Sequence, residues 1–231
     1  MVFGKAERIE MVAFGDTSII HFSFFIIHYP LSIPPKEVYM FILASQSPRR
    51  RELLSMLGLS FDIVTADIDE TMDASVSVED AVTEISRKKA EAVGKDRPGR
   101  LIVSADTIVT VDGRVLGKPH SEAEAHAMLR SLSGRTHTVM TAFCLYLDGR
   151  TETHVEKTDV VFKPLSDEEI DAYIATGSPM DKAGAYGIQD GAAVFVERLI
   201  GDYYNVMGLP VCELAKRLRT HGVPVLGTVI P

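Results

Sequence analysis

Several polar side chains that could bind and cleave a phosphate chain interrupt otherwise apolar segments of this sequence. Arginine and lysine neutralise phosphates, and the arginine guanidinium binds pairs of phosphate oxygens in a fork geometry. A pair of carboxylates suits Mg²⁺, which takes oxygen ligands and usually keeps waters and substrate phosphates in its shell. A glutamine amide carries both a donor and an acceptor, so it matches the polar edge of a nucleobase. The residues that fit this chemistry are Ser45, Arg49, Glu70, Lys89, Asp106, Lys118 and Gln189.

The segment Leu43-Ala-Ser-Gln-Ser-Pro-Arg-Arg-Arg51 must position the first of these residues, and it predicts a strand, a loop and a helix start. Ser47 is a favourable helix N-cap, and Pro48 suits the first turn because no partner is needed for its missing N–H there. The leucines that follow share one helix face, and Gly58 marks the end of the helix. Two serine hydroxyls and free N–H groups therefore gather at a helix N-terminus.

Three arginines occupy the first turn of this predicted helix, where cations oppose the helix dipole. The arrangement does not favour the helix itself, and it becomes sensible if a polyanion binds there. A solvated basic helix start is the alternative that these residues leave open. Arg50 and Arg51 fit a solvated face or a subunit contact better than a phosphate site.

Lys89 and Asp106 each occupy a position where a charge is unexpected. The helix predicted from Ser77 to about Val93 places Lys89 near its apolar face, which indicates a lysine that points into a cleft. The segment 101–111 is apolar almost throughout and predicts a central strand covered on both faces, and Asp106 interrupts it. A buried carboxylate is costly unless it is paired, bound to a metal or placed at the mouth of a site. An aspartate that bonds a neighbouring turn is the structural alternative.

The rest of the chain alternates strand and helix patterns. Asp112-Gly113 and Asp148-Gly149 predict hairpin turns, and Ser121 and Ser166 each begin a capping box. Together these signals predict an α/β fold with a mixed, twisted sheet flanked by helices. The expected strands are 41–44, 61–65, 101–111, 136–147, 150–162 and 192–200; helices are expected to span 48–57, 77–93, 121–132, 166–176 and 209–218, with loops at 66–71 and 201–205.

Composition excludes several classes of protein. The net charge of −8 argues against a nucleic-acid-binding surface, so any anion site must be a local basic cleft. Cys144 and Cys212 form no CxxC pair, and we expect both to be reduced core residues in a reducing compartment, the cytoplasm. The histidines show no HxH or HExxH spacing, so no zinc site is predicted.

Residues 1–39 do not share the pattern of the rest of the chain. The apolar run Ile19–Ile27 is too short to span a bilayer, and no cleavage signal follows it, so we expect neither a membrane span nor a secretory signal. Three prolines between 30 and 35 then break regular structure. We expect residues 1–39 to be an appendage, disordered or read from an upstream start codon, and residues 40–231 to form the functional domain.

The ordered motifs resemble those of the Maf family of nucleotide pyrophosphatases. The run 43–50 is similar to the signature of this family, and Ser104-Ala-Asp-Thr107 and Gly117-Lys-Pro119 resemble later motifs. The segments Asp181-Lys-Ala-Gly-Ala-Tyr-Gly-Ile-Gln189 and Gly201–Pro210 follow in the same order. The resemblance covers Met40 to about Leu218. It implies a cleft for a nucleoside triphosphate, which is hydrolysed to the monophosphate and pyrophosphate, a divalent cation (Mg²⁺ or Mn²⁺) as cofactor, and a homodimer.

The same resemblance assigns roles to individual residues and favours the branch that acts on dTTP and UTP. Asp106 would be the proton acceptor, and Arg49, Thr107 and Gln189 would set base preference. The phosphate and metal site would be lined by Ser45, Glu70, Lys89 and Lys118, with Glu70 and Asp106 on the metal.

A departure from the family pattern falls at Asp190, where a glycine is expected, and it affects the predicted conformation of the loop after Gln189. Elsewhere in the motifs, Lys182 could reach the site, but an exposed lysine is the commoner outcome and the one expected here.

Two other functions remain open from the sequence. One is a pyrophosphatase for modified purine nucleotides such as 7-methyl-GTP, and Thr107 and Gln189 argue against it. The other is a non-catalytic nucleotide-binding regulator of cell division. Retention of Asp106 and Glu70 together with both lysines argues against the regulator, because a protein that only binds needs no base.

Overall fold

The structure, a computed structural model, describes residues 41–73 and 75–227. The predicted appendage at 1–39 lies outside the described residues. None of the helices in the described part of the chain combines the length and the apolar run that a bilayer crossing requires.

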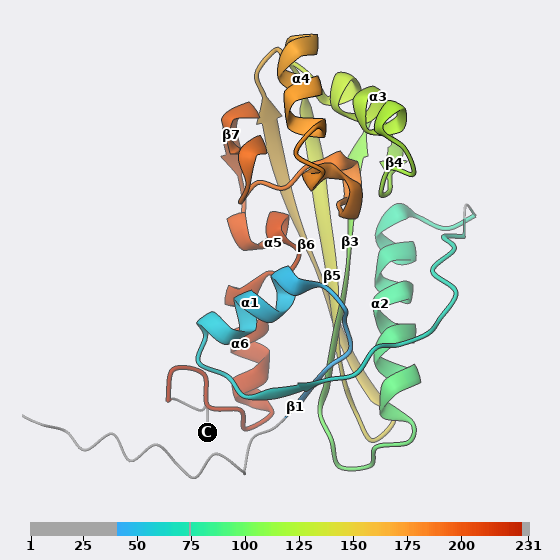
Figure 1. Cartoon of the computed structure of the whole chain (residues 1–231). Helices are drawn as coiled ribbons and strands as arrows, with labels where there is room; N and C mark the ends of the chain where they lie inside the picture. Colours follow the sequence, from blue (N-terminus) through green and yellow to red (C-terminus); the bar gives the residue numbers. More distant parts are fainter. Residues whose placement is uncertain (1–40, 74, 228–231) are drawn as a thin grey trace, which may run out of the picture. The chain divides into compact units, whose positions relative to one another are not determined.

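The described residues form a mixed seven-stranded sheet with helices on both faces (Figure 1), which confirms the predicted α/β class. The strand order is β2-β1-β3-β5-β6-β7, and β4 pairs with β3 beyond the end of β1. β1 runs parallel to both β2 and β3, and the remaining pairs are antiparallel. The strands are β1 Phe41–Leu43, β2 Phe61–Ile63, β3 Ile102–Val111, β4 Arg114–Leu116, β5 Thr136–Leu147, β6 Arg150–Phe162 and β7 Val196–Ile200.

Six α-helices and three short 3-10 helices complete the described fold. The α-helices are α1 Pro48–Met56, α2 Val78–Gly94, α3 Glu122–Leu132, α4 Asp167–Ile174, α5 Tyr203–Met207 and α6 Val211–Thr220. The 3-10 helices are η1 Ser178–Asp181, η2 Ala183–Ala185 and η3 Gly191–Phe195. As predicted, Ser47 caps α1 with its side chain, and Ser166 forms a complete capping box with Glu169.

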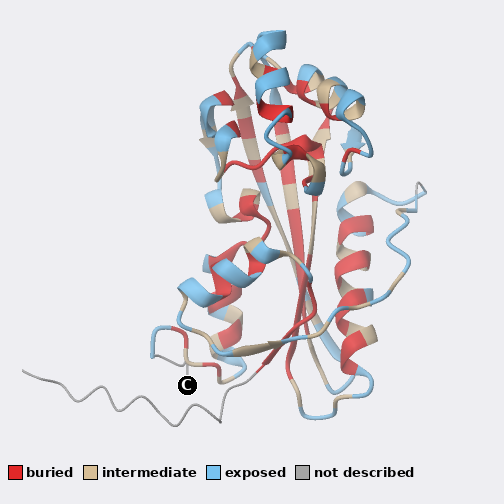
Figure 2. Cartoon of the chain, in the orientation of Figure 1, coloured by how far each residue is buried: buried red, intermediate tan, exposed pale blue. Residues whose placement is uncertain are grey.

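The alternation of side chains along β3 divides the core between the two faces of the sheet. Ile102 and Ile108 pack with residues of α2, whereas Val103 and Val109 belong to the large cluster that includes α1, α3, α4 and α6. Figure 1 shows α2 on one side of the sheet and α1 and α6 on the other. Buried residues follow the central strands and the sheet-facing side of α2 (Figure 2). β3 is therefore covered on both faces, as its apolar sequence predicts.

The short first strand leaves part of β3 without a neighbour. β1 pairs with β3 only at Ile102 and Val103, and β4 pairs with it only from Val109 onward. On that side, the edge of β3 between these points is open to groups other than strands. The connections from β1 through α1 and from β2 through α2 lie on opposite faces of the sheet, and ligands in such folds bind at this kind of switch point.

Three predictions from the sequence need correction. The chain from Gly191 to Phe195 is 3-10 helix rather than strand, because Asp190 accepts a hydrogen bond from the Ala192 N–H and starts a turn. The predicted loop at 201–205 contains the start of α5, which Asp202 caps. Cys144 is buried as predicted, but Cys212 is exposed because α6 turns its neighbours toward the core.

Candidate active site

A cavity of about 880 Å³ opens at the unpaired edge of β3, within the size range of small-molecule sites. Its walls come from the loop after β1, the acidic loop after β2, the middle of β3, the loop after β4, and the segment around η1 and η2. Each predicted site residue lines this one cavity. They are Ser45, Arg49, Glu70, Lys89, Asp106, Thr107, Lys118 and Gln189.

Asp106, Lys89 and Glu70 form a charged cluster on the α2 side of the cavity. The Lys89 ammonium lies 2.7 Å from Asp106 Oδ1 and 3.0 Å from Glu70 Oε2. The side chains of Lys89 and Asp106 are 10% and 15% exposed, and that of Glu70 is 55% exposed. Lys89 therefore points into the cleft, as its place on the apolar face of α2 predicts, and orients the carboxylate of Asp106.

Arg50 is buried, which corrects the prediction of a solvated face or subunit contact. Its Nη1 atom donates to the Ala105 carbonyl (2.7 Å) on the open edge of β3, where a neighbouring strand would otherwise bind. Its Nε atom donates to the Gly208 carbonyl (2.8 Å) after α5. Burial lowers the pKa of Arg50, and the nearby charge of Asp106 opposes that shift. The guanidinium thus joins α1, β3 and α5 beneath the cavity.

The Thr107 hydroxyl is part of a hydrogen-bond chain that continues into the sheet. Arg50 Nη2 donates to Thr107 Oγ1 (3.0 Å), which lies 2.9 Å from Thr141 Oγ1. Thr141 donates its own proton to the Asn205 carbonyl (2.9 Å), so the Thr107 hydroxyl must donate to Thr141. The proton order in this chain is fixed by protein groups, and Thr107 retains only acceptor capacity toward the cavity.

The Ser45 hydroxyl forms hydrogen bonds that stabilise its own loop, and the residue also lines the cavity. Its hydroxyl accepts from the Ser47 N–H (3.2 Å) and from Arg50 Nη1 (3.1 Å). Ser47 in turn accepts from the Arg50 N–H at the first turn of α1. Ser45 therefore sits at the mouth of α1, where helix N–H groups and the helix dipole favour an anion.

Arg49 crosses from α1 to the glycine-rich segment. Its Nη1 atom lies 3.0 Å from Asp181 Oδ2, and Lys182 Nζ lies 2.7 Å from the other oxygen of the same carboxylate. Burial raises the pKa of Asp181, but the hydrogen bond from Lys182 and the charge of Arg49 outweigh burial, and the pKa lies below its usual value.

Lys182 is buried, contrary to the prediction of an exposed lysine. Its ammonium also donates to the carbonyl and hydroxyl of Ser178, at 2.6 and 3.2 Å. Together with the contact to Asp181, these bonds use its three protons within the protein. Lys182 therefore lines the cavity with its stem and leaves no proton for a substrate.

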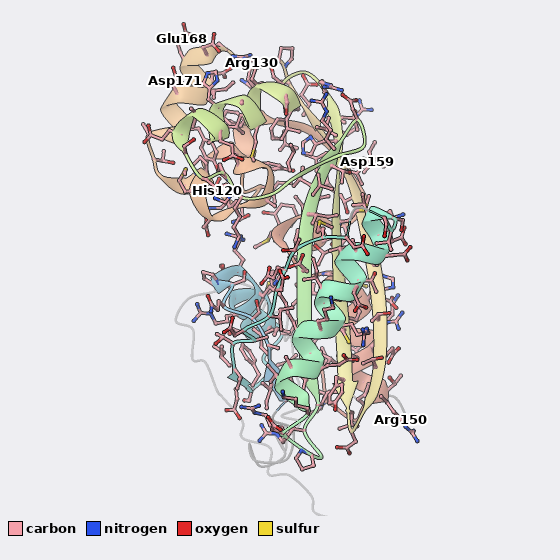
Figure 3. The ribbon with its side chains drawn as sticks, turned by 90° about the vertical axis from the view of Figure 1, so that its right-hand side faces the viewer. His120, Arg130, Arg150, Asp159, Glu168 and Asp171 are labelled. Carbon is pink, nitrogen blue, oxygen red and sulfur yellow. The ribbon has the colours of Figure 1, made fainter. Side chains whose placement is uncertain are left out.

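Gln189 and Lys118 approach the cavity from its other walls. The Oε1 atom of Gln189 is buried and has no hydrogen-bond partner among the described residues. A buried acceptor without a partner is costly, and no described residue supplies the missing donor. Lys118 is exposed in the loop after β4 and makes no ion pair within the described part of the chain. His120, in the same loop, also lines the cavity, and Figure 3 shows it on the side of the α3 and α4 region nearer α1.

The donor set fits a divalent cation only in part. Glu70 and Asp106 each use one carboxylate oxygen for Lys89, and their second oxygens have no protein partner in the described ranges. No group of three or more His, Cys, Asp or Glu side chains that could hold a metal occurs in those ranges. Two carboxylates with the rest of the shell from water and phosphate oxygens is the arrangement that Mg²⁺ commonly adopts.

The sequence patterns did not identify the residues that support the site from beneath the cavity. Arg50, Thr141 and Asn205 bind partners far away in the sequence, up to 158 positions for Arg50 and Gly208, and no local pattern reveals them. Asp106 and Lys89, by contrast, were detectable because each places a charge in an apolar pattern.

The sequence of this chain matches known proteins over most of its length. The family model described as Maf-like protein matches residues 40–221. A dTTP/UTP pyrophosphatase of Bacillus cereus is 46% identical over 184 residues, which cover 80% of this chain and 96% of that protein. A dTTP/UTP pyrophosphatase of Bacillus mycoides is 47% identical over 178 residues, 77% of this chain and 93% of the relative.

Among solved structures, the Staphylococcus aureus Ham1 protein matches with a TM-score of 0.38 and 13% identity, over 53% of this chain and 71% of that one; this likeness is too weak to support an argument. The family model and the curated relatives each span most of the chain, and the predicted resemblance is confirmed: the chain belongs to the Maf family.

Proposed function

We propose that this protein is a nucleoside triphosphate pyrophosphatase that hydrolyses dTTP and UTP to the monophosphate and pyrophosphate. The observation that carries the proposal is the cluster of Asp106, Lys89 and Glu70 in the cavity at the open edge of β3. The relatives named dTTP/UTP pyrophosphatase, which share nearly half of their residues with this chain, support the choice of reaction and substrate.

In the proposed mechanism, Asp106 is the general base. Its carboxylate takes a proton from a water molecule, whose oxygen forms a bond to the α-phosphorus while the bond from that phosphorus to the bridging oxygen breaks. The leaving group is pyrophosphate. Lys89 holds one oxygen of Asp106 at 2.7 Å, which leaves the other oxygen for the water.

The cations of the cavity share the work of neutralising the phosphate chain. Arg49, Lys89 and Lys118 would counter the charge that develops on the leaving pyrophosphate, and the mouth of α1 with Ser45 would bind a phosphate oxygen. Lys182 is left out of this set because its protons are used within the protein.

We further propose that Glu70 and Asp106 would hold a divalent cation, Mg²⁺ or Mn²⁺, directly or through water. When bound, such an ion neutralises phosphate charge and increases the acidity of a coordinated water. Glu70 would hold the ion with the carboxylate oxygen that has no protein partner in the described ranges, and Lys89 would keep its contact with Asp106.

Base preference is assigned to Arg49, Thr107 and Gln189, as the resemblance implies. Two features of the site support this assignment. The buried Oε1 atom of Gln189 lacks a donor, and the Thr107 hydroxyl can only accept. A phosphate oxygen offers no proton to either atom, whereas the N–H of a uracil or thymine ring does.

The remaining proposals concern the setting of the enzyme. We propose a homodimer in the cytoplasm that acts on free nucleotides and does not bind nucleic acid. Light scattering on the purified protein tests the dimer, and a single-subunit mass would contradict it.

A direct test of the proposed function is pyrophosphate release from UTP, with Mg²⁺ present and then chelated. We expect release of pyrophosphate and UMP only in the presence of the ion. Glu70→Gln should raise the Mg²⁺ concentration needed for half-maximal rate. Tight UTP binding without any product in either condition would favour the non-catalytic regulator.

A further inference from the structure

We propose that Asp190 is a positioning residue that holds Gln189 in place and thereby sets how strongly the protein discriminates among bases. The inference rests on the proposed function. Asp190 itself does not line the cavity, whereas Gln189, the preceding residue, does.

The Asp190 carboxylate collects contacts from three neighbouring segments. Its Oδ1 atom accepts from the Tyr173 hydroxyl of α4 (2.9 Å), and its Oδ2 atom accepts from the Ser178 hydroxyl of η1 (2.6 Å). The buried Lys182 ammonium lies 3.4 Å from Oδ2. One carboxylate therefore joins α4, η1 and the loop that carries Gln189.

The same contacts fix the backbone on both sides of Gln189. The Tyr173 hydroxyl accepts from the Gly187 N–H (3.2 Å), two residues before Gln189. Asp190 Oδ1 accepts from the Ala192 N–H (3.1 Å), which is three residues after Gln189. Because Tyr173 also donates to Asp190, the hydrogen bonds of the Gly187 N–H and of the Ala192 N–H both depend on the Asp190 carboxylate.

The space around the carboxylate allows little rearrangement. A Cβ atom added to Gly187 would lie 2.7 Å from Asp190 Oδ2 and 2.7 Å from Lys182 Cε, so both side chains pack directly against the Gly187 backbone. Asp190 has a φ of −117°, a value that any residue adopts. The aspartate therefore occupies the expected glycine position without strain and adds contacts that a glycine lacks.

The protonation states suit this arrangement. Burial raises the pKa of Tyr173, so the phenol keeps the proton that it donates. Burial also acts to raise the pKa of Asp190, but the hydrogen bonds from Ser178, Ala192 and Tyr173 outweigh it, and the pKa lies below its usual value. An ionised carboxylate with several donors is a firm anchor for a loop.

The need for an anchor follows from the state of Gln189. Its buried Oε1 atom has no partner among the described residues, so no hydrogen bond of that oxygen holds the side chain in place. A loop without other ties would move the amide to water or to another donor. The Asp190 contacts oppose that movement before any ligand binds.

The experiment is a double-mutant cycle between Asp190→Ala and Gln189→Ala. The ratio of kcat/KM for UTP to that for CTP is measured in the wild type, both single variants and the double variant. We expect Asp190→Ala to lower this ratio about tenfold when Gln189 is present, the effect of about one hydrogen bond. In the Gln189→Ala background the same change should leave the ratio unaltered.

Two further variants distinguish a loss of positioning from a general loss of structure. Asp171→Ala removes a carboxylate of α4 that is 70% exposed and points outward in Figure 3. It should leave the UTP to CTP ratio unchanged. Tyr173→Phe keeps the ring and removes only the hydroxyl, which bonds both Asp190 and Gly187, so it should lower the UTP to CTP ratio. This variant tests the proposal independently of whether Asp190→Ala folds. Thermal unfolding of each variant identifies any that has lost the fold.

Amide hydrogen exchange tests the anchor without any turnover and so separates this inference from the proposed function. We expect faster exchange at Gly187 in Asp190→Ala and Tyr173→Phe than in the wild type. Unchanged exchange at Gly187, or an equal fall of the UTP to CTP ratio with and without Gln189, would overturn the positioning role. A wild-type protein that hydrolyses neither nucleotide would contradict the proposed function alone.

Discussion

Two adjacent arginines of α1 provide a sharp test of how the site is held together. Arg50 is buried and donates four hydrogen bonds, two of them to the backbone carbonyls of Ala105 and Gly208. Arg51 is exposed and makes one contact of 3.3 Å with the Gln46 carbonyl. The sequence gives no means of telling them apart, so their substitution isolates the effect of the buried contacts.

The size of the expected difference follows from the acceptors that Arg50→Ala would leave unpaired. The hydroxyls of Ser45 and Thr107 can rotate to other partners, but the two carbonyls are held in place, and each buried unpaired acceptor costs about 1–3 kcal/mol. The variant no longer has to bury a charged guanidinium on folding. Because burial disfavours that charge, this saving offsets part of the sum. We expect Arg50→Ala to lower the free energy of unfolding by roughly 2–4 kcal/mol.

The assay is urea unfolding followed by circular dichroism, with Arg51→Ala as the matched control. The control should lie within about 0.5 kcal/mol of the wild type, as is usual for exposed positions. Equal slopes of the unfolding free energy against urea concentration would show that the variants unfold from the same compact state. Equal midpoints for Arg50→Ala and Arg51→Ala would refute the structural role of the buried guanidinium.

Three further predictions follow from the site and the core. Asp106→Asn should reduce kcat by at least about 100-fold and leave nucleotide binding largely intact, and near-normal turnover would exclude Asp106 as the base. Gln189→Ala should weaken discrimination among bases more than it slows the best substrate, whereas an equal loss for each triphosphate would exclude a role in base recognition. Burial lowers the pKa of His137 to about 4, against the opposing charge of Asp159. Because the unfolded chain binds the proton from about pH 6.5 downward, His137 should reduce stability as the pH falls from about 6.5 to 4, by up to about 3 kcal/mol. This acid sensitivity should diminish in His137→Phe, measured as the pH dependence of urea unfolding.

Local sequence patterns were sufficient for the elements that local interactions determine. Ser47 caps α1, and the Asp148-Gly149 turn joins β5 and β6 at the predicted residues. A charge within an apolar pattern was enough to place Lys89 and Asp106 in the cleft, because burial of an unpaired charge is too costly to occur without a reason.

The errors have two causes: a partner that is distant in the sequence, and local side-chain contacts that follow no periodic pattern. The partners of Arg50 include Gly208, 158 positions away, and those of Lys182 form a compact 3-10 segment that has no periodic pattern. The run from Ala192 to Phe195 has strand-forming composition, but the Asp190 side chain starts a turn there instead. A tertiary contact decided the case of Arg50, and local side-chain contacts decided the other two.

The central claim, attack of water on the α-phosphate of dTTP and UTP, is tested most directly by a nucleotide panel in ¹⁸O-labelled water. The protein and Mg²⁺ are incubated separately with dTTP, UTP, CTP, dATP, GTP and 7-methyl-GTP. The products are separated by anion exchange, and their masses are measured by mass spectrometry. We expect monophosphate and pyrophosphate from dTTP and UTP, with the label in the monophosphate. Release of inorganic phosphate, label in the pyrophosphate, or cleavage of 7-methyl-GTP alone would contradict it.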